Sequence, residues 1–296
     1  MKRLLLALTV GSLVLHAGVI GQVATAEKTG TLDFYATEKD GSTAKDLTPA
    51  DLTLKIGGRE QAIRSVEMIG PSIGPRNIVL IVDEATLYAL EPIVKDAVAK
   101  LLASLKPGDA VGFYSTRGTQ IMLTTERETI KTAVEKLRTG PGVLYPCQRD
   151  LMKLIAADAV QVPPGRSTSI AVISRGHPEG PSTTGDSDVG PCTPRRQDLR
   201  ELDEAISMAQ VNLHFFTVDA AQRSWGFDNI AGNTGATSGL LTWSNHDALE
   251  RTLQSSRAYH RLTFAWNATN DRVQRVELRA PDKDIKIETS PWLRPK

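Results

Sequence analysis

The sequence lacks the charge imbalance that nucleic-acid binding requires. Among its 296 residues, 35 Lys and Arg stand against 34 Asp and Glu, so the formal net charge is only +1. A basic patch or stripe is the electrostatic signature of proteins that bind nucleic acid or anionic membranes. No extended basic run occurs, and we therefore exclude nucleic acid as a partner.

Aromatic residues, glycine and proline are also modest in number. Aromatic residues make up 5% of the chain, with 23 Gly and 16 Pro, while hydrophobic residues reach 41%. The hydrophobic fraction is too high for a disordered chain, and Gly and Pro are too few for a low-complexity one. The length predicts one large domain, or a mid-sized domain with a smaller companion.

Long hydrophobic runs are missing except at the N-terminus. Lys2 and Arg3 precede an apolar run at residues 4–20, and Ala-Thr-Ala follows at residues 24–26. This is the pattern of a secretory signal peptide, which we expect to comprise residues 1–26. A retained anchor helix is the alternative, but the run is interrupted by polar and glycine residues, and a spanning helix needs roughly 20 apolar residues. We expect a secreted or periplasmic protein with no membrane insertion after cleavage.

Cysteine is scarce, with Cys147 and Cys192 as the only two. In an oxidising compartment such a pair favours a disulfide. The bridge would close a loop of about 45 residues, for which chain entropy suggests roughly 4 kcal/mol of stabilisation. Two free thiols remain the alternative.

Buried strands alternate with amphipathic helices through the middle of the chain. Continuous apolar runs at residues 78–82, 169–174 and 213–218 are typical of strands covered on both faces. Helical stripes lie between and after them, one starting at Leu87 and one behind a capping box formed by Thr125 and Glu128. This alternation predicts an α/β fold with a doubly wound, mostly parallel sheet at residues 75–256. The segments 27–74 and 257–296 are β-rich, and we expect them to pack together.

Ligands of such sheets bind outside the carboxyl ends of the strands. Asp83 and Glu84 follow the first buried strand directly, and Arg175 follows the second. These residues and the loops around them are therefore the candidate binding site.

Four stretches resemble the von Willebrand factor A-type (vWA) domain in its bacterial "VWFA-related" form. They are Arg-Asn-Ile-Val-Leu-Ile-Val-Asp at 76–83, Leu-Lys-Pro-Gly-Asp-Ala-Val-Gly-Phe at 105–113, Gly-Pro-Gly-Val-Leu-Tyr at 140–145, and the segment from Leu202 to Asp219. The β-rich flanks resemble the leading and closing parts of the same family. Each stretch alone is weakly specific, whereas their order and spacing are more so.

The resemblance implies a Mg²⁺ site, the metal-ion-dependent adhesion site, built from Asp-x-Ser-x-Ser, a Thr and a later Asp. Only the first Asp is present, as Asp83. The two Ser positions are Ala85 and Leu87, the Thr position is Val143, and the later Asp aligns with Arg175. A fixed positive charge opposes binding of a dication. We therefore expect no metal cofactor and hypothesise that the Arg175 guanidinium takes the place of the metal.

Two alternatives stay open at this site. A rearranged Mg²⁺ site could use oxygens of Glu84 and Thr86, which lie one position out of frame. Arg175 could also be a solvated loop residue with no part in binding. The candidate binding set at the carboxyl-end loops is Asp83, Glu84, Thr86, Val143 and Arg175.

The sequence contains no recognisable combination of nucleophile, base and orienting residue. We therefore expect a non-enzymatic binding module whose partner is an unidentified envelope or extracellular protein. An extracytoplasmic hydrolase with an unrecognised site is the alternative, and a mainly structural part of an envelope assembly is a third. Activity on generic ester and peptide substrates, measured for the wild type and for Asp83→Ala, would distinguish a hydrolase from a binding module.

Overall fold

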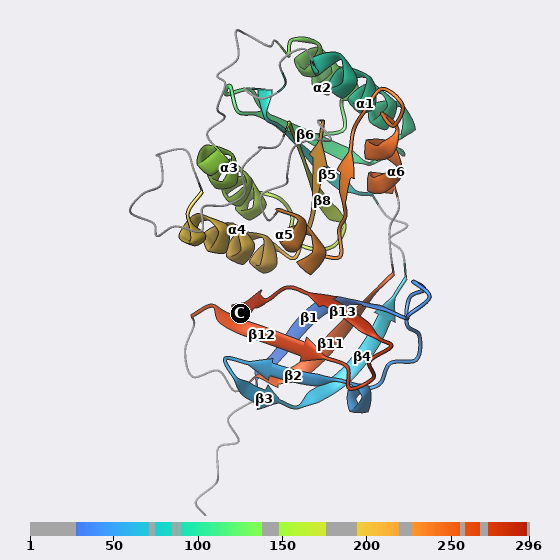
Figure 1. Ribbon diagram of the computed structural model, residues 1–296, viewed down its shortest axis with the longest axis vertical. Coiled ribbons are helices and arrows are strands. Elements are labelled where there is room, and N and C mark those ends of the chain that lie inside the picture. The colour runs from blue at the N-terminus through green and yellow to red at the C-terminus, as the bar shows by residue number, and fades with distance from the viewer. Residues whose placement is uncertain are drawn as a thin grey trace, which may run out of the picture.

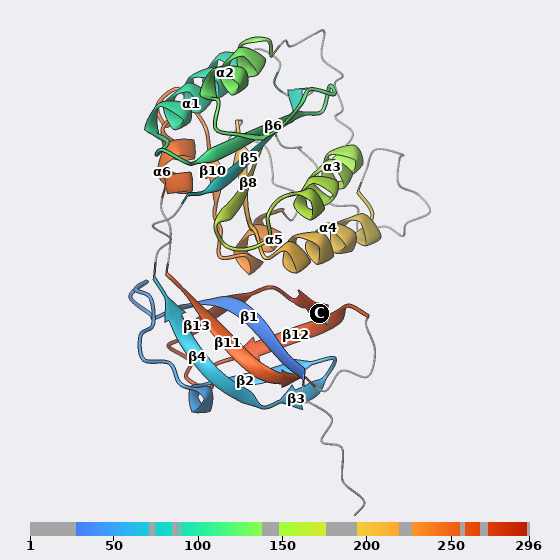
Figure 2. The same cartoon turned by 180° about the vertical axis from the view of Figure 1, so that it is seen from behind.

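The computed structural model places an α/β domain on a β-sandwich (Figures 1 and 2). It describes residues 28–70, 75–84, 87, 90–137, 148–175, 194–218, 227–254, 258–266 and 272–294. The chain runs from the sandwich into the α/β domain after residue 69 and returns to the sandwich at residue 259. Both halves of the chain therefore contribute to the sandwich.

The α/β domain is built on a six-stranded sheet in which all strands but one are parallel. Its order is β10 (Ser238–Leu240), β9 (Asn212–Thr217), β8 (Thr168–Ser174), β5 (Asn77–Val82), β6 (Ala110–Ser115) and β7 (Gln120–Thr124). Only the edge strand β7 is antiparallel to its neighbour. The central strands β5 and β8 are almost entirely buried, which explains their continuous apolar sequences.

Helices cover both faces of this sheet, as Figure 1 shows. One face carries α1 (Glu91–Ser104), α2 (Arg127–Glu135) and α6 (Ala248–Gln254); the other carries α3 (Gln148–Gln161), α4 (Arg196–Ala209) and α5 (Phe227–Asn233). Successive residues of a strand point to opposite faces, so Leu80 packs in the first core and Val79 and Ile81 pack in the second. The predicted doubly wound α/β fold is confirmed.

Two local predictions were wrong. The helix expected from Leu87 begins at Glu91, and Leu87 instead packs in the core with no exposed surface. The capping box expected at Thr125 and Glu128 does not form, because α2 begins at Arg127 behind Glu126, which makes no side-chain cap hydrogen bond. Periodicity identifies a helical face better than it identifies a helix end.

The sandwich consists of two four-stranded antiparallel sheets. One has the order β13 (Lys286–Thr289), β1 (Lys28–Thr37), β11 (Tyr259–Trp266) and β4 (Ile63–Ile69); the other has β14 (Trp292–Leu293), β12 (Gln274–Arg279), β2 (Thr53–Ile56) and β3 (Arg59–Gln61). A short 3₁₀ turn, Pro49–Asp51, precedes β2. Strand β1 pairs with β11 along seven residues, with Leu32 opposite Leu262, and β2 pairs with β12. The N- and C-terminal segments thus form one hydrophobic core.

A buried arginine joins the two domains. Arg166, in the turn before β8, donates hydrogen bonds to the carbonyl oxygens of Thr234 (2.9 Å) and Val211 (3.3 Å). Its guanidinium also lies over the ring of Tyr35 from β1, and the Tyr35 hydroxyl donates to Asn212 Oδ1 at 3.1 Å. These contacts place the sandwich at the amino ends of the parallel strands, away from Asp83.

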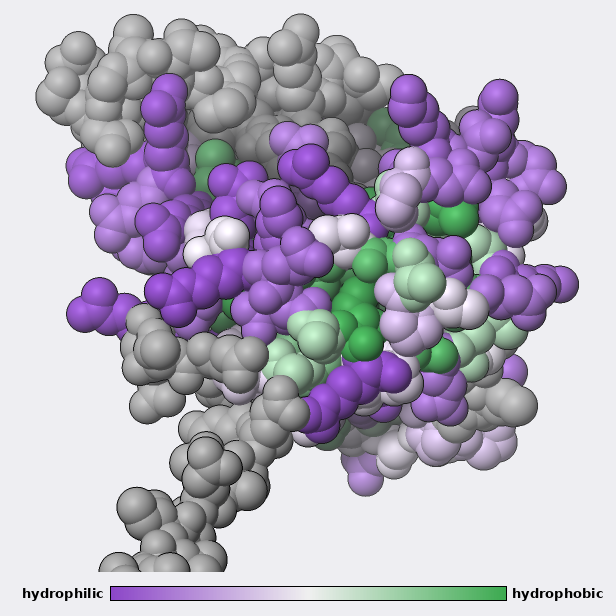
Figure 3. All heavy atoms as spheres, turned by 90° about the horizontal axis from the view of Figure 1, so that it is seen from below, coloured by the Kyte–Doolittle hydropathy of each residue, from purple (hydrophilic) through white to green (hydrophobic). Residues whose placement is uncertain are grey.

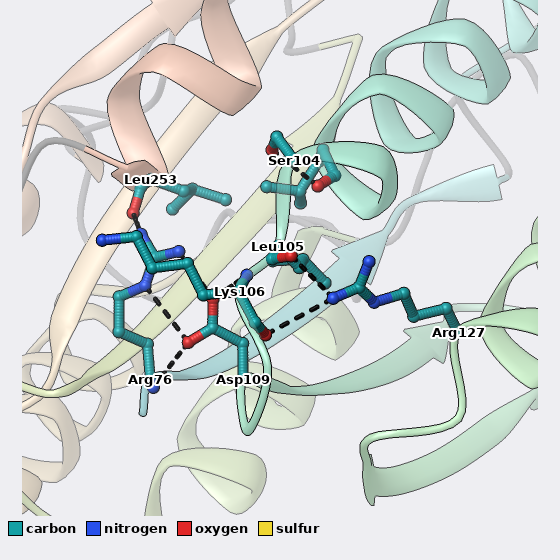
Figure 4. Close-up of polar contacts among 8 residues, drawn as sticks. Arg76, Ser104, Leu105, Lys106, Asp109, Arg127 and Leu253 are labelled. Atoms are coloured by element: carbon teal, nitrogen blue, oxygen red, sulfur yellow. Dashed lines mark hydrogen bonds and ion pairs between the residues drawn. The ribbon is translucent and has the colours of Figure 1, made fainter. Parts of the chain in front are cut away.

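A second arginine organises the start of the sheet (Figure 4). The Arg76 guanidinium forms an ion pair with Asp109 at 2.7 Å and donates to the carbonyl oxygen of Leu253 at 2.8 Å. Asp109 also accepts from the backbone nitrogen of Lys106 at 3.0 Å. Burial raises the pKa of Asp109, but the hydrogen bonds from Arg76 and Lys106 outweigh it and hold that pKa below its usual value. The cluster ties β5, the turn before β6 and α6 together.

On the sandwich end of the molecule, hydrophobic residues gather in a central area that hydrophilic residues border (Figure 3). Within the described ranges, no helix has both the length and the apolar character needed to cross a membrane.

Candidate functional site

The candidate site is the edge of the sheet where the central parallel strands end together. Val82, the last residue of β5, lies opposite Ser115 of β6 and Ile173 of β8. The ladder continues for one residue, since the backbone nitrogen of Asp83 donates to Ile173 at 2.9 Å and that of Thr116 donates to Val82 at 3.1 Å. The register therefore brings the residues after three strands to one place.

The Asp83 carboxylate lies between two hydroxyl groups at this edge. Thr116 Oγ1 donates to Oδ1 of Asp83 at 3.2 Å, and Ser174 Oγ donates to Oδ2 at 3.1 Å. Asp83 is only 2% exposed. A buried carboxylate is costly unless it is hydrogen-bonded, and here each oxygen has a donor from a different neighbouring strand. The hydrogen bonds link β5 to β6 and to β8.

Glu84 forms a second, looser charged contact beside Asp83. Its Oε2 lies 3.9 Å from Nε of Arg117, whose side chain is partly exposed. Burial raises the pKa of Glu84, while Arg117 and a hydrogen bond from Ser115 act against that rise. The edge thus carries the buried Asp83 carboxylate and the Glu84 carboxylate, which forms a long ion pair with the partly exposed Arg117.

The structure places three of the five predicted binding residues. Asp83 and Glu84 lie at the carboxyl end of β5, and Arg175 lies directly after β8 with its side chain exposed. Thr86 and Val143 lie outside the described residues, as do Cys147 and Cys192. The disulfide and the substitution of Arg175 for a metal therefore stay predictions.

The resemblance implies a Mg²⁺ site with near-octahedral oxygen ligands. Leu87, where it would place a Ser ligand, is buried in the hydrophobic core. Both Asp83 oxygens already accept hydrogen bonds, and Arg117 lies beside the only neighbouring described carboxylate. Across the described part of the chain, no cluster of three or more His, Cys, Asp and Glu side chains could hold a metal ion.

His214 is a buried histidine that lies on one of the parallel strands. It lies on β9, and burial lowers its pKa to about 4, although a hydrogen bond from the Thr237 backbone acts in the opposite direction. It is therefore neutral near pH 7 and packs against Phe216. A neutral, packed side chain agrees with a structural role for His214. Three residues of β9 separate it from the carboxyl-end edge.

Sequence reasoning missed Thr116, Arg117 and Ser174. The signal was present, because all three are polar residues at or just after the end of a buried strand. No sequence pattern indicated that the turn after β6 would bring Thr116 to Asp83. Only the register of β5, β6 and β8 identifies the partners of this carboxylate.

Comparisons with known proteins bear on the fold. No protein-family model matches the sequence, and the search of curated proteins found no match. The search of solved structures found distant matches, and one of them carries the name VWA2. The α/β domain has a vWA-like fold. This follows from the mostly parallel six-stranded sheet, the helices on both faces and the order of the blocks along the chain.

Three of these structures illustrate how distant the likeness is. They are an aerotolerance-related membrane protein from Bacteroides fragilis (13% identity, 60% of this chain and 96% of that one, TM-score 0.40), the ArnB paralog VWA2 from Sulfolobus acidocaldarius (10%, 90% and 75%, 0.37) and the pilus adhesin SpaC from Lactobacillus rhamnosus GG (13%, 75% and 34%, 0.41). The chain thus spans only about a third of SpaC. At these TM-scores, no single structure adds to what the vWA-like topology itself establishes.

Proposed function

We propose that this protein is a non-enzymatic, extracytoplasmic vWA-like module that binds a protein partner through its carboxyl-end edge without a metal ion. The observation that carries the proposal is the Asp83 carboxylate, whose two oxygens accept hydrogen bonds from Thr116 and Ser174. In this role Asp83 holds three strands together at the edge and presents their loops. Extracytoplasmic placement rests on the predicted signal peptide.

The charges of the edge favour a partner with acidic groups. Arg117 is partly exposed and Arg175 is exposed, whereas the two carboxylates beside them are buried. A surface with exposed cations and buried anions attracts acidic segments of a partner and raises the rate at which that partner associates. The metal that usually provides the positive charge in this fold is then unnecessary, because fixed guanidinium groups provide it.

The proposal assigns no catalysis to the edge. Within the described ranges, the edge combines two carboxylates, three hydroxyls and two arginines. His214 is buried and neutral, and it lies inside β9, opposite Ala171 of β8. Activation of a hydroxyl nucleophile requires an adjacent base held by a third group. Ser174 and Thr116 instead donate to a carboxylate that already serves both of them.

Site-specific cross-linking tests the proposal on the full chain. A photo-cross-linking residue is introduced at Arg117 or Arg175. The control position is Lys106, which lies at the amino-end side of the sheet, before β6. We expect a cross-linked protein partner from the first two positions only, in the presence or absence of a chelator. Arg117→Glu should weaken capture about tenfold, and Lys106→Glu should leave it unchanged.

Two results would contradict the proposal. Equal cross-linking from Lys106 would show that the carboxyl-end edge is not the binding surface. Loss of the partner on adding chelator would show that binding depends on a divalent cation.

A further inference from the structure

A cavity of about 390 Å³ lies between the α/β domain and the sandwich. The C-terminal ends of α3 and α4 form one wall, and strands β1, β11 and β14 form the other. Small-molecule sites typically occupy roughly 300–1,000 Å³ and often lie at domain interfaces. The cavity is at the amino-end side of the parallel sheet and shares no residue with the edge around Asp83.

The walls of this cavity are mostly apolar. Val162, Ala205, Ala209, Trp266 and Leu293 line it, and each of these side chains is otherwise buried. Apolar surface that stays next to water is unfavourable by about 25 cal/mol per Å². An apolar occupant would therefore remove water from both domains at once.

Among the described residues, one charged residue lines the cavity, and it is a cation. Arg294 follows β14 and is exposed, while no described Asp, Glu or Lys contributes to the lining. The guanidinium of Arg294 makes no hydrogen bond or ion pair within the described part of the chain. An apolar chamber with a single guanidinium at its rim is complementary to an amphipathic anion.

We infer that this cavity binds a medium-chain carboxylate, with the alkyl chain among the apolar side chains and the carboxylate at Arg294. Arginine suits this role because its planar donors match a carboxylate in bidentate geometry. The bound molecule would touch α3, α4 and three sandwich strands, and so would strengthen the contact between the domains. This site is independent of the proposed protein-binding edge and would stand if that proposal failed.

Binding is measured on the full chain by calorimetry and by thermal unfolding, with octanoate, decanoate and dodecanoate below their micelle concentrations. We expect saturable binding, a melting temperature that rises with ligand concentration, and a negative heat-capacity change from apolar burial. Decanol is the neutral analogue of decanoate. It should bind the wild type more weakly than decanoate does.

Two kinds of variant separate binding of the ligand's alkyl chain from binding of its carboxylate head group. Ala205→Leu or Ala209→Leu fills the cavity from α4 and should abolish binding of both decanoate and decanol. The matched control, Ala103→Leu, makes the same change at an exposed position of α1 and should leave both unaffected. Arg294→Gln should weaken the binding of decanoate about tenfold and leave the binding of decanol unchanged.

Several outcomes would overturn the inference. These are absence of binding by every carboxylate, equal binding in the cavity-filling variants, or equal effects of Arg294→Gln on acid and alcohol. A melting temperature that falls in both filling variants, with no ligand binding by the wild type, would mean that the chain itself occupies the cavity. Capture by phosphatidylglycerol vesicles without binding of the free acids would point to a membrane surface instead.

Discussion

The guanidinium carbon of Arg166 lies 5.3 Å from the centre of the Tyr35 ring. The two residues belong to different domains, and Tyr35 continues the link by donating to Asn212 of β9. Arg166 is buried, with 8% of its surface exposed, yet its described hydrogen-bond acceptors are all uncharged oxygens. The position of the vWA-like domain on the sandwich thus depends on a buried cation whose terminal nitrogens donate to carbonyl oxygens and whose face lies over an aromatic ring, while its Nε has no hydrogen-bond partner within the described residues.

Replacing Arg166 should therefore destabilise the protein strongly. Arg166→Met leaves the carbonyl oxygens of Thr234 and Val211 without this donor, and unsatisfied buried polar groups cost about 1–3 kcal/mol each. We expect the free energy of unfolding to fall by about 2–4 kcal/mol in urea titrations. The control is Arg200→Met, which removes an exposed cation over Trp292 and should cost less than about 1 kcal/mol. Similar losses in the two variants would contradict a special role for Arg166.

Asp158 should make stability depend on pH in the mildly acidic range. It lies on α3, burial raises its pKa to about 6, and its Oδ2 has no hydrogen-bond partner within the described residues. Because the folded-state pKa exceeds the unfolded value of about 4, the folded state binds the proton more tightly. Stability from this group is therefore present below about pH 4 and is lost as the pH rises towards 6.

Asp158→Asn should remove that dependence. At pH 7.5 the variant should be more stable than the wild type by about 1–3 kcal/mol, whereas at pH 4 the difference should vanish. Urea unfolding at several pH values measures this. Asp150→Asn, at an exposed position of the same helix, should show no such change with pH. A wild-type stability that is flat between pH 4 and 7 would refute the expectation.

Magnesium should not stabilise the protein. A metal bound at 100 times its dissociation constant adds roughly 2.7 kcal/mol, which thermal unfolding detects easily. We expect no rise in the melting temperature at millimolar Mg²⁺ beyond that caused by NaCl at equal ionic strength. A rise in the wild type that disappears in Asp83→Ala would instead show a rearranged site that includes Asp83.

Gly235 should not tolerate a side chain. Its φ of +68° is a left-handed conformation, and a Cβ there would overlap the ring of Tyr35. Gly235→Ala should therefore lower the free energy of unfolding by about 2–4 kcal/mol, through backbone strain and overpacking together. Gly118 has a φ of +93° but open space around it, so Gly118→Ala isolates the backbone effect and should cost about 1 kcal/mol. Equal losses would show that the Tyr35 contact is not rigid.

Much of the fold was predictable because it depends on local sequence patterns. The runs at 78–82, 169–174 and 213–218 are apolar on both faces, and they form β5, β8 and β9. The helical stripe predicted between the first two of these strands forms α1, although the helix begins at Glu91. The segment Phe227–Asn233, α5, was not predicted, because it is short and carries no clear stripe.

The site was predictable only in part. That Asp83 and Glu84 lie at the carboxyl-end edge follows from chain order alone, since parallel strands end at the same side of the sheet. The partners of Asp83 come from 33 and 91 residues away in the chain, as Thr116 and Ser174. No local pattern carries that information.

The amino-acid sequence by itself determined which segments form strands and helices and at which edge the charged residues gather, because periodicity and strand polarity are local properties. The tertiary structure decided which hydroxyls satisfy Asp83, how β1 and β11 join the chain ends into one sandwich, and where Arg166 and the cavity beside Arg294 lie. Those features depend on strand register and on the packing of two domains. Both are set by contacts between residues far apart in the chain.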